Sequence, residues 1–247
     1  IIMADQLGKS VGDMYEGAMV PGLVLTTLYV GYVVILSLLK PSHCPALPPE
    51  ARSLRGLKLA TRVLTTLVPP LVLIFLVLGT IFLGIATPTE GGAMGAMGAL
   101  ILAVARKRLS FKLLKQAMET TGKLSSFVVF ILVGSTVFGL IFRAVNGDLW
   151  VEHLLLGLPG GQVGFLIVVN ILVFVLAFFL DFFELSFIIV PLLAPVADKL
   201  GIDLVWFGVL LAVNMQTSFM HPPFGFALFY LRSVAPPTVT TTDIYWG

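Results

Sequence analysis

Two acidic residues, Asp181 and Glu184, interrupt a long apolar stretch that reads LAFFLDFFELSFIIVPLLAP. A helix from residue 164 to residue 180 rises about 25 Å, so both acids would lie deep in a membrane. Charged groups at that depth cost several kcal/mol unless they line a cavity or have partners. We therefore predict that the two acids lie on one helix face, where they neutralise a cation or hold one another through Ser186 and the facing helix break. The alternative is that one acid is protonated or pairs with a basic side chain, without binding an ion.

The next apolar stretch, 204–231, has a polar segment in its middle. This segment contains Asn214, Gln216, Thr217, Ser218, His221, Pro222 and Pro223. Two consecutive prolines remove two backbone donors, so the segment predicts a broken membrane helix. Oxygen atoms exposed by such a break are typical cation ligands, and the candidates are Thr217, Ser218, Met220 and His221. The alternative is that the two hydroxyls bond back to the preceding turn, as they often do in membrane helices.

His221 has two possible roles in this segment. It could contact a carboxylate or titrate with coupled protons, because small changes move the imidazole pKa across physiological pH. The alternative is a hydrogen-bonded structural histidine.

An earlier interruption, TPTE at 87–90, separates two other apolar stretches. Pro88 alone could explain it, yet the polar side chains beside it could also bind a substrate. The candidate substrate ligands are Thr87, Thr89, Glu90, Gln216 and Pro222.

The elements that position these residues follow from the spacing. We predict a re-entrant helical hairpin over 164–200 with its tip near 181–186, followed directly by the broken helix. Broken backbone is tolerated at membrane depth only where it lines protein or a watery cavity. A hairpin tip and a helix break at one depth form the kind of ion and substrate site that secondary transporters use.

Composition places the whole chain in a membrane. Of 247 residues, 58% are hydrophobic and only 11% are charged, whereas soluble domains are about half apolar and a quarter charged. The net charge of +2 is too small for a nucleic-acid surface. Cys44 is the only cysteine, so no internal disulfide can form. The predicted fold class is therefore an all-α polytopic membrane protein.

Charge-free windows and basic loops divide the chain into four parts. Roughly 20 apolar residues span a bilayer, and loops rich in Lys and Arg stay cytoplasmic. The parts are 1–62, a transmembrane helix with a basic cytoplasmic loop; 63–105, two membrane segments around TPTE; 106–163, an interfacial helix at 106–118, a span at 124–142 and an extracytoplasmic connection; and 164–247, the hairpin and broken helix.

Other protein classes fit the sequence less well. The chain lacks the HExxH motif of metalloproteases and the GxSxG turn of serine hydrolases, so we do not expect an enzyme or a cofactor beyond a coupling ion. A passive channel is a second alternative, but it would be expected to line a continuous pore. A scaffolding subunit has no need of costly acids in mid-membrane.

Three pieces of the sequence resemble a known family. GIATPTEGGAMGA (84–96), FFLDFFELSFIIVPLLAPVADKLGIDLVWFGV (178–209) and VNMQTSFMHPPFGFALFYLRSVAP (213–236) are similar to the large membrane subunit of the tripartite ATP-independent periplasmic (TRAP) transporters, the DctM-like permease. ADQLGKSVGDMYEGAMVPG (4–22) looks like the middle of that subunit. The resemblance covers essentially the whole chain, which matches the C-terminal half of the family's inverted repeat.

This resemblance implies an elevator-type, sodium-coupled importer of organic acids in the bacterial inner membrane. A small membrane subunit and a periplasmic solute-binding protein would be its partners, and one half of the inverted repeat would be missing from this chain. Asp181, Glu184, Ser186, Thr217, Ser218, Met220 and His221 would then be sodium ligands. The variants DFFE and QTSFMHPPFGF resemble the branch associated with 2-oxo acids and related carboxylates. An ion-coupled carboxylate transporter without a binding protein is the nearest alternative.

Overall fold

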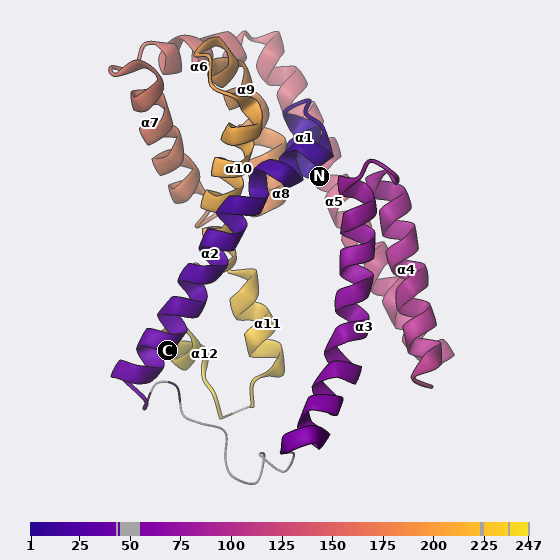
Figure 1. Cartoon of the computed structure of the whole chain (residues 1–247). Coiled ribbons are helices and arrows are strands. Elements are labelled where there is room, and N and C mark those ends of the chain that lie inside the picture. The colour runs from indigo at the N-terminus through magenta and orange to yellow at the C-terminus, as the bar shows by residue number, and fades with distance from the viewer. Residues whose placement is uncertain (43, 45–54, 223–224, 237, 247) are drawn as a thin grey trace. The chain divides into compact units, whose positions relative to one another are not determined.

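The computed structural model describes residues 1–42, 44, 55–222, 225–236 and 238–246 (Figure 1). Every regular element in this part of the chain is helical, which confirms the all-α prediction. The first helices are α1 (Ile2–Gln6), α2 (Val11–Leu39), α3 (Gly56–Phe82), α4 (Pro88–Ala105), α5 (Phe111–Ala144), α6 (Gly147–Leu156) and α7 (Gly161–Leu176). They are followed by α8 (Phe182–Glu184), the π-helical turn η2 (Leu185–Ile189), α9 (Val190–Lys199), α10 (Leu204–Met215), the 3-10 turn η3 (Gln216–Phe219), α11 (Phe226–Val234) and α12 (Thr241–Trp246).

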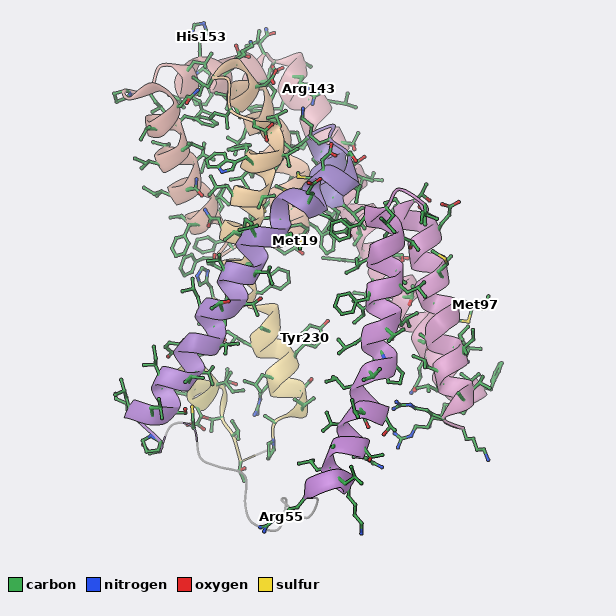
Figure 2. The ribbon with its side chains drawn as sticks, in the orientation of Figure 1. Met19, Arg55, Met97, Arg143, His153 and Tyr230 are labelled. Carbon is green, nitrogen blue, oxygen red and sulfur yellow. The ribbon has the colours of Figure 1, made fainter. Side chains whose placement is uncertain are left out.

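Among the described residues, four helices are long and apolar enough to cross a membrane, namely α2, α3, α4 and α5. Almost none of their side chains is buried within the protein. Figure 2 shows Met19 of α2 and Met97 of α4 projecting outward from their helices. Long apolar surfaces of this kind are stable against lipid and not against water. The pattern is that of a multi-pass membrane protein.

Helix α5 differs from the expected arrangement of two separate segments. Residues 111–118 of the predicted interfacial stretch 106–118 and the predicted span 124–142 are joined in one uninterrupted helix from Phe111 to Ala144, whereas residues 106–110 precede this helix. No proline lies between them, and Gly122 alone costs a helix only about 1 kcal/mol relative to alanine. An interfacial position for the first turns of α5 stays a prediction.

The chain divides into two compact units. The first contains residues 1–21 and 122–247, and the second contains residues 22–121. The hairpin and the broken helix belong to the first unit, whereas TPTE at 87–90 belongs to the second.

The first unit has its core between α7, α9 and α10 (Figure 1). Phe165 of α7 and Phe207 of α10 are fully buried, with ring centroids 5.8 Å apart. The N-terminal residues pack against α10 at Gly208. The side chains of Leu7 and Met14 occupy the space that a side chain at position 208 would need. Lipid is as apolar as such a core, so close packing, rather than escape from water, holds these helices together. This core fixes the hairpin arms beside α10.

The second unit is built on an antiparallel pair of helices, α3 and α4, joined at 83–87. A Cβ atom at Gly91 would lie 2.8 Å from Cδ1 of Ile81, and one at Gly98 would lie 2.3 Å from Cδ1 of Leu73. Small residues at such positions let two membrane helices approach closely. The same register brings Arg106, just after α4, to the backbone carbonyl of Thr65, to which its guanidinium donates.

Pro69 and Pro70 lie inside α3 without breaking it. A proline at 69 cannot donate to the carbonyl of Thr65 four residues earlier, and the Arg106 guanidinium supplies that missing donor. A double proline thus lies in a continuous helix here, where Arg106 replaces one of the two lost donors.

Candidate ion and substrate site

The hairpin turn brings Asp181 to the start of its second arm. Helix α7 ends at Leu176, residues 177–180 form the turn, and α8 begins directly after Asp181. The turn thus precedes the predicted tip at 181–186 by several residues. Helices are observed on both sides of this turn, α7 before it and α8, η2 and α9 after it, while their re-entrant arrangement in a membrane stays a prediction.

Asp181 and Glu184 form a capping box. The Asp181 carboxylate accepts from the Glu184 backbone N–H at 2.9 Å, and the Glu184 carboxylate accepts from the Asp181 N–H at 3.2 Å. The expectation that both acids share one helix face is wrong, because Asp181 caps the helix from outside. The spacing D-x-x-E is itself the signature of this motif, so the sequence carried the signal.

The capping box leaves capacity for a cation at this turn. Asp181 is only 3% exposed, and among the described residues neither carboxylate has a basic partner within 4 Å. Each ionised carboxylate offers about four acceptor positions, of which the box uses one on each residue. A bound cation would offset the charge that burial makes costly. Their role as sodium ligands stays a prediction.

Ser186 lies in the π-helical turn η2 and is completely buried. Its hydroxyl donates to the sulfur of Met3 at 3.7 Å. The hydroxyl is therefore turned to the N-terminal segment, while its oxygen retains acceptor capacity. Single π-helical turns are frequent at functional sites, which supports the choice of this segment.

The predicted break after α10 is present. Helix α10 ends at Met215, η3 tightens the chain into a 3-10 turn, and α11 starts at Phe226 after Gly225. The Thr217 carbonyl accepts from the N–H groups of Met220 and His221 at 2.9 and 3.2 Å. The His221 carbonyl accepts from the Gly225 N–H at 2.6 Å. The His221 carbonyl therefore has one lone pair left for another partner, whereas the two hydrogen bonds to the Thr217 carbonyl use both of its lone pairs.

The hydroxyls at the break bond back to α10. Thr217 donates to the Asn214 carbonyl and Ser218 to the Met215 carbonyl, both at 2.7 Å. This is the structural alternative that the sequence left open. Donation occupies the hydroxyl hydrogen only, so both oxygens keep lone pairs for a cation. The sodium role of Thr217 and Ser218 stays a prediction, as does that of Met220.

His221 connects the break to the hairpin turn. Its imidazole stacks on the ring of Phe178 with centroids 4.1 Å apart, and it meets the edge of Phe174 at 5.1 Å. Its Nδ1 atom is buried without a hydrogen-bond partner among the described residues. Phe178 lies three residues before Asp181, so this stack brings the two predicted site segments together.

A pair of asparagines, which the sequence reasoning did not combine, ties α7 to α10. The side-chain amide of Asn214 donates to the backbone carbonyl of Asn170 at 2.8 Å and to its side-chain oxygen at 3.0 Å. Asn170 interrupts the otherwise apolar stretch 163–176 of α7, and that isolation was the available signal. The pair lies one turn before the break, so it fixes where α10 ends relative to the hairpin.

The predicted substrate ligands fall in both compact units. Gln216 and Pro222 are exposed at the break. Thr87 and Glu90 form a second capping box at the start of α4, in which the Glu90 carboxylate accepts from the Thr87 N–H at 2.7 Å. This box and Pro88 explain the interruption structurally. Substrate binding by these residues and by Thr89 stays a prediction.

A cavity of about 240 Å³ lies elsewhere in the first unit. Most of its lining is apolar, with Gln6, Ser135, Thr136 and Arg143 as polar members. It includes neither Asp181 nor Thr217, so it is not the predicted ion site.

Comparisons with known proteins identify the family. A family model described as "Tripartite ATP-independent periplasmic transporter, DctM component" matches residues 1–247. The C4-dicarboxylate TRAP transporter large permease protein DctM of Rhodobacter capsulatus is 29% identical over 95% of this chain and 52% of its own length. The sialic acid TRAP transporter large permease protein SiaM of Vibrio cholerae is 28% identical over 91% of this chain and 51% of its own length.

A further relative has a longer chain. The isethionate TRAP transporter permease protein DctMQ of Oleidesulfovibrio alaskensis is 28% identical over 92% of this chain and 35% of its own length. The chain thus spans about half the length of the two large permease relatives and a third of the longer one. Since the family model covers the chain from end to end, the chain belongs to the DctM component family of tripartite ATP-independent periplasmic transporters.

Proposed function

We propose that this chain is part of the large permease of a sodium-coupled importer of an organic acid in the bacterial inner membrane. Family membership supports transport as the activity. The observation that carries the ion coupling is the contact between His221 and Phe178, which joins a buried carboxylate turn to a helix break. Such pairs of interrupted elements hold ions and substrates in secondary transporters.

Sodium would bind between the hairpin turn and the break. It is a hard cation that takes oxygen ligands, and both segments offer them. The carboxylates of Asp181 and Glu184 would supply charge, with Ser186 nearby on the second arm. Hydroxyl and carbonyl oxygens would come from Thr217, Ser218, Met220 and His221.

The substrate would be an organic acid, and more specifically a 2-oxo acid or a related carboxylate. Relatives are named for C4-dicarboxylates, isethionate and sialic acid, all of which are organic anions. The narrower choice rests on the sequence variants DFFE and QTSFMHPPFGF. Helix N-termini favour anionic groups, and α11, which begins at Phe226 after the break, offers one in the first unit.

The remaining partners follow the tripartite construction. A small membrane subunit and a periplasmic solute-binding protein would act with the permease. One relative, DctMQ, is named as a single permease protein. Elevator movement of the hairpin and broken helix is part of the same proposal. It would carry the loaded site across the membrane without opening a continuous pore.

Proteoliposome uptake separates this function from its alternatives. The complete permease, its small subunit and the purified binding protein are assayed with labelled pyruvate, a 2-oxo acid, and with labelled succinate, a C4-dicarboxylate. We expect uptake only with an inward sodium gradient and the binding protein, and faster uptake of pyruvate. Uptake down a pyruvate gradient without sodium would favour a passive channel. Sodium-driven uptake without the binding protein would favour the simpler ion-coupled transporter.

A further inference from the structure

Three arginines gather at one end of the α3–α4 helix pair. Arg62 lies in α3, and Arg106 and Arg108 follow the end of α4. Together with Thr65 and Thr66 they line a cavity of about 490 Å³. The cluster belongs to the second compact unit, whereas the residues proposed for ion binding belong to the first.

A second cavity continues the first along α3. It measures about 400 Å³ and shares Arg62 and Thr65 with its neighbour, while Lys58 adds another positive charge. Arg55, labelled at the start of α3 in Figure 2, extends the basic series beyond it. The two cavities therefore form one hollow that is rich in cationic donors.

No carboxylate of the described residues lines this hollow. The only acid in the sequence of α3, α4 and their connection is Glu90. It lies at the opposite end of α4, about 24 Å away by helix rise. An anion from outside the chain is the partner that this charge would favour.

The depth of the cluster matches the headgroup layer of a membrane. The charge-free stretch 63–82 of α3 rises about 30 Å, which equals the hydrocarbon thickness of a typical bilayer. Arg62 then lies at one boundary of the hydrocarbon. Arg106 comes to the same level, because its guanidinium reaches the Thr65 carbonyl. Both helices thus place their arginines where lipid phosphates are found.

We propose that this hollow binds the phosphate of an anionic phospholipid headgroup. The planar fork of arginine matches phosphate oxygens in pairs, and Arg106 keeps further donors besides the one it gives to Thr65. Basic pockets between membrane helices on the cytoplasmic side are suited to such lipids. Basic residues that only keep a loop on the cytoplasmic side need not line a cavity. Arg62, Arg106 and Arg108 do line one.

Native mass spectrometry of the purified, delipidated transporter tests this binding. The protein is incubated with equal amounts of phosphatidylglycerol, which is anionic, and phosphatidylethanolamine, which is not. We expect preferential retention of phosphatidylglycerol. Because one basic residue near a lipid surface changes binding about fivefold, Arg62→Gln and Arg108→Gln should each weaken retention by about that factor. Arg106 is left unchanged, since it also satisfies a backbone carbonyl.

Lys107→Gln is the matched control for charge. It removes one positive charge from the same loop but lies outside both cavity linings, so retention should change less than twofold. The unfolding temperature without lipid should be the same in all three variants, which separates lost binding from lost structure. An equal loss in Lys107→Gln, or equal retention of both lipids, would overturn the proposal. Binding of inorganic phosphate without retention of phosphatidylglycerol would also overturn it.

Discussion

The imidazole of His221 lies nearly parallel to the ring of Phe178, at an angle of 8° and with centroids 4.1 Å apart. His221 belongs to the segment that breaks a helix, and Phe178 belongs to the turn between two hairpin arms. The stack is therefore the contact through which the two irregular segments of the first unit meet. The Nδ1 atom of the stacked imidazole is buried and has no hydrogen-bond partner among the described residues.

Replacing His221 separates packing from chemistry. His221→Phe retains a ring against Phe178 and should keep the unfolding temperature, whereas His221→Ala should lose about 1 kcal/mol for each aromatic contact removed. Thermal unfolding of the purified transporter measures both. If His221→Phe keeps stability but loses uptake, the imidazole nitrogen has a direct role in binding. Equal stability of the alanine variant would show that the stack does not hold the two segments together.

The asparagine pair should stabilise the contact between α7 and α10. Asn214→Leu should cost about 1 kcal/mol, because it removes two interhelical hydrogen bonds, each worth about 0.6 kcal/mol on average in membranes. Asn170→Leu should weaken this contact less, since the Asn170 backbone carbonyl still accepts from Asn214. The double variant should cost less than the sum, since both changes remove the bond between the two side chains. Chemical unfolding of the four proteins in detergent measures the cycle. Additive costs would contradict the pairing.

Close approach in the second unit depends on Gly98. Gly98→Val should cost about 1–3 kcal/mol, because the new side chain meets Leu73 and the helices must move apart. Gly92→Val is the control, since nothing lies within 4 Å of a Cβ atom at Gly92. Thermal unfolding compares the two variants. Partial rescue of Gly98→Val by Leu73→Ala would attribute the loss to this contact, and equal effects of the two glycine changes would argue against it.

Asp181→Asn distinguishes an ion ligand from a helix cap. Asparagine is as good an N-cap as aspartate, so the variant removes the charge and preserves the start of α8. We expect normal membrane insertion and stability with loss of sodium-dependent uptake in proteoliposomes. Uptake that retains its sodium dependence would leave Asp181 with a structural role only.

The sequence predicted the helical fold and both interruptions, because charges and prolines are conspicuous in apolar windows. It also predicted the family, which the comparisons confirm. The roles of Asp181 and Glu184 were harder to assign. A spacing of three fits one helix face and a capping box equally well, and only the backbone shows that Asp181 stands outside the helix.

Prolines show a second limit of the sequence. The pair at 69–70 lies inside α3, whereas Pro222 follows a helix that has already ended at Met215. The difference depends on donors that are remote in sequence, since Arg106 is 41 positions from the Thr65 carbonyl that it satisfies. Local rules cannot find such a partner. The stack of His221 on Phe178 was hidden for the same reason, as its two residues lie on different elements.

Sodium binding to the purified transporter with Thr217→Ala tests the central claim most directly. Thr136→Ala is the matched control, because Thr136 donates to the carbonyl of Leu132 in α5 in the same way that Thr217 donates to Asn214. Binding of radioactive sodium is measured for both variants and the wild type. We predict an affinity at least about tenfold weaker for Thr217→Ala, equivalent to about 1.4 kcal/mol, and no change for Thr136→Ala. Unchanged sodium affinity in Thr217→Ala would contradict a site at the helix break.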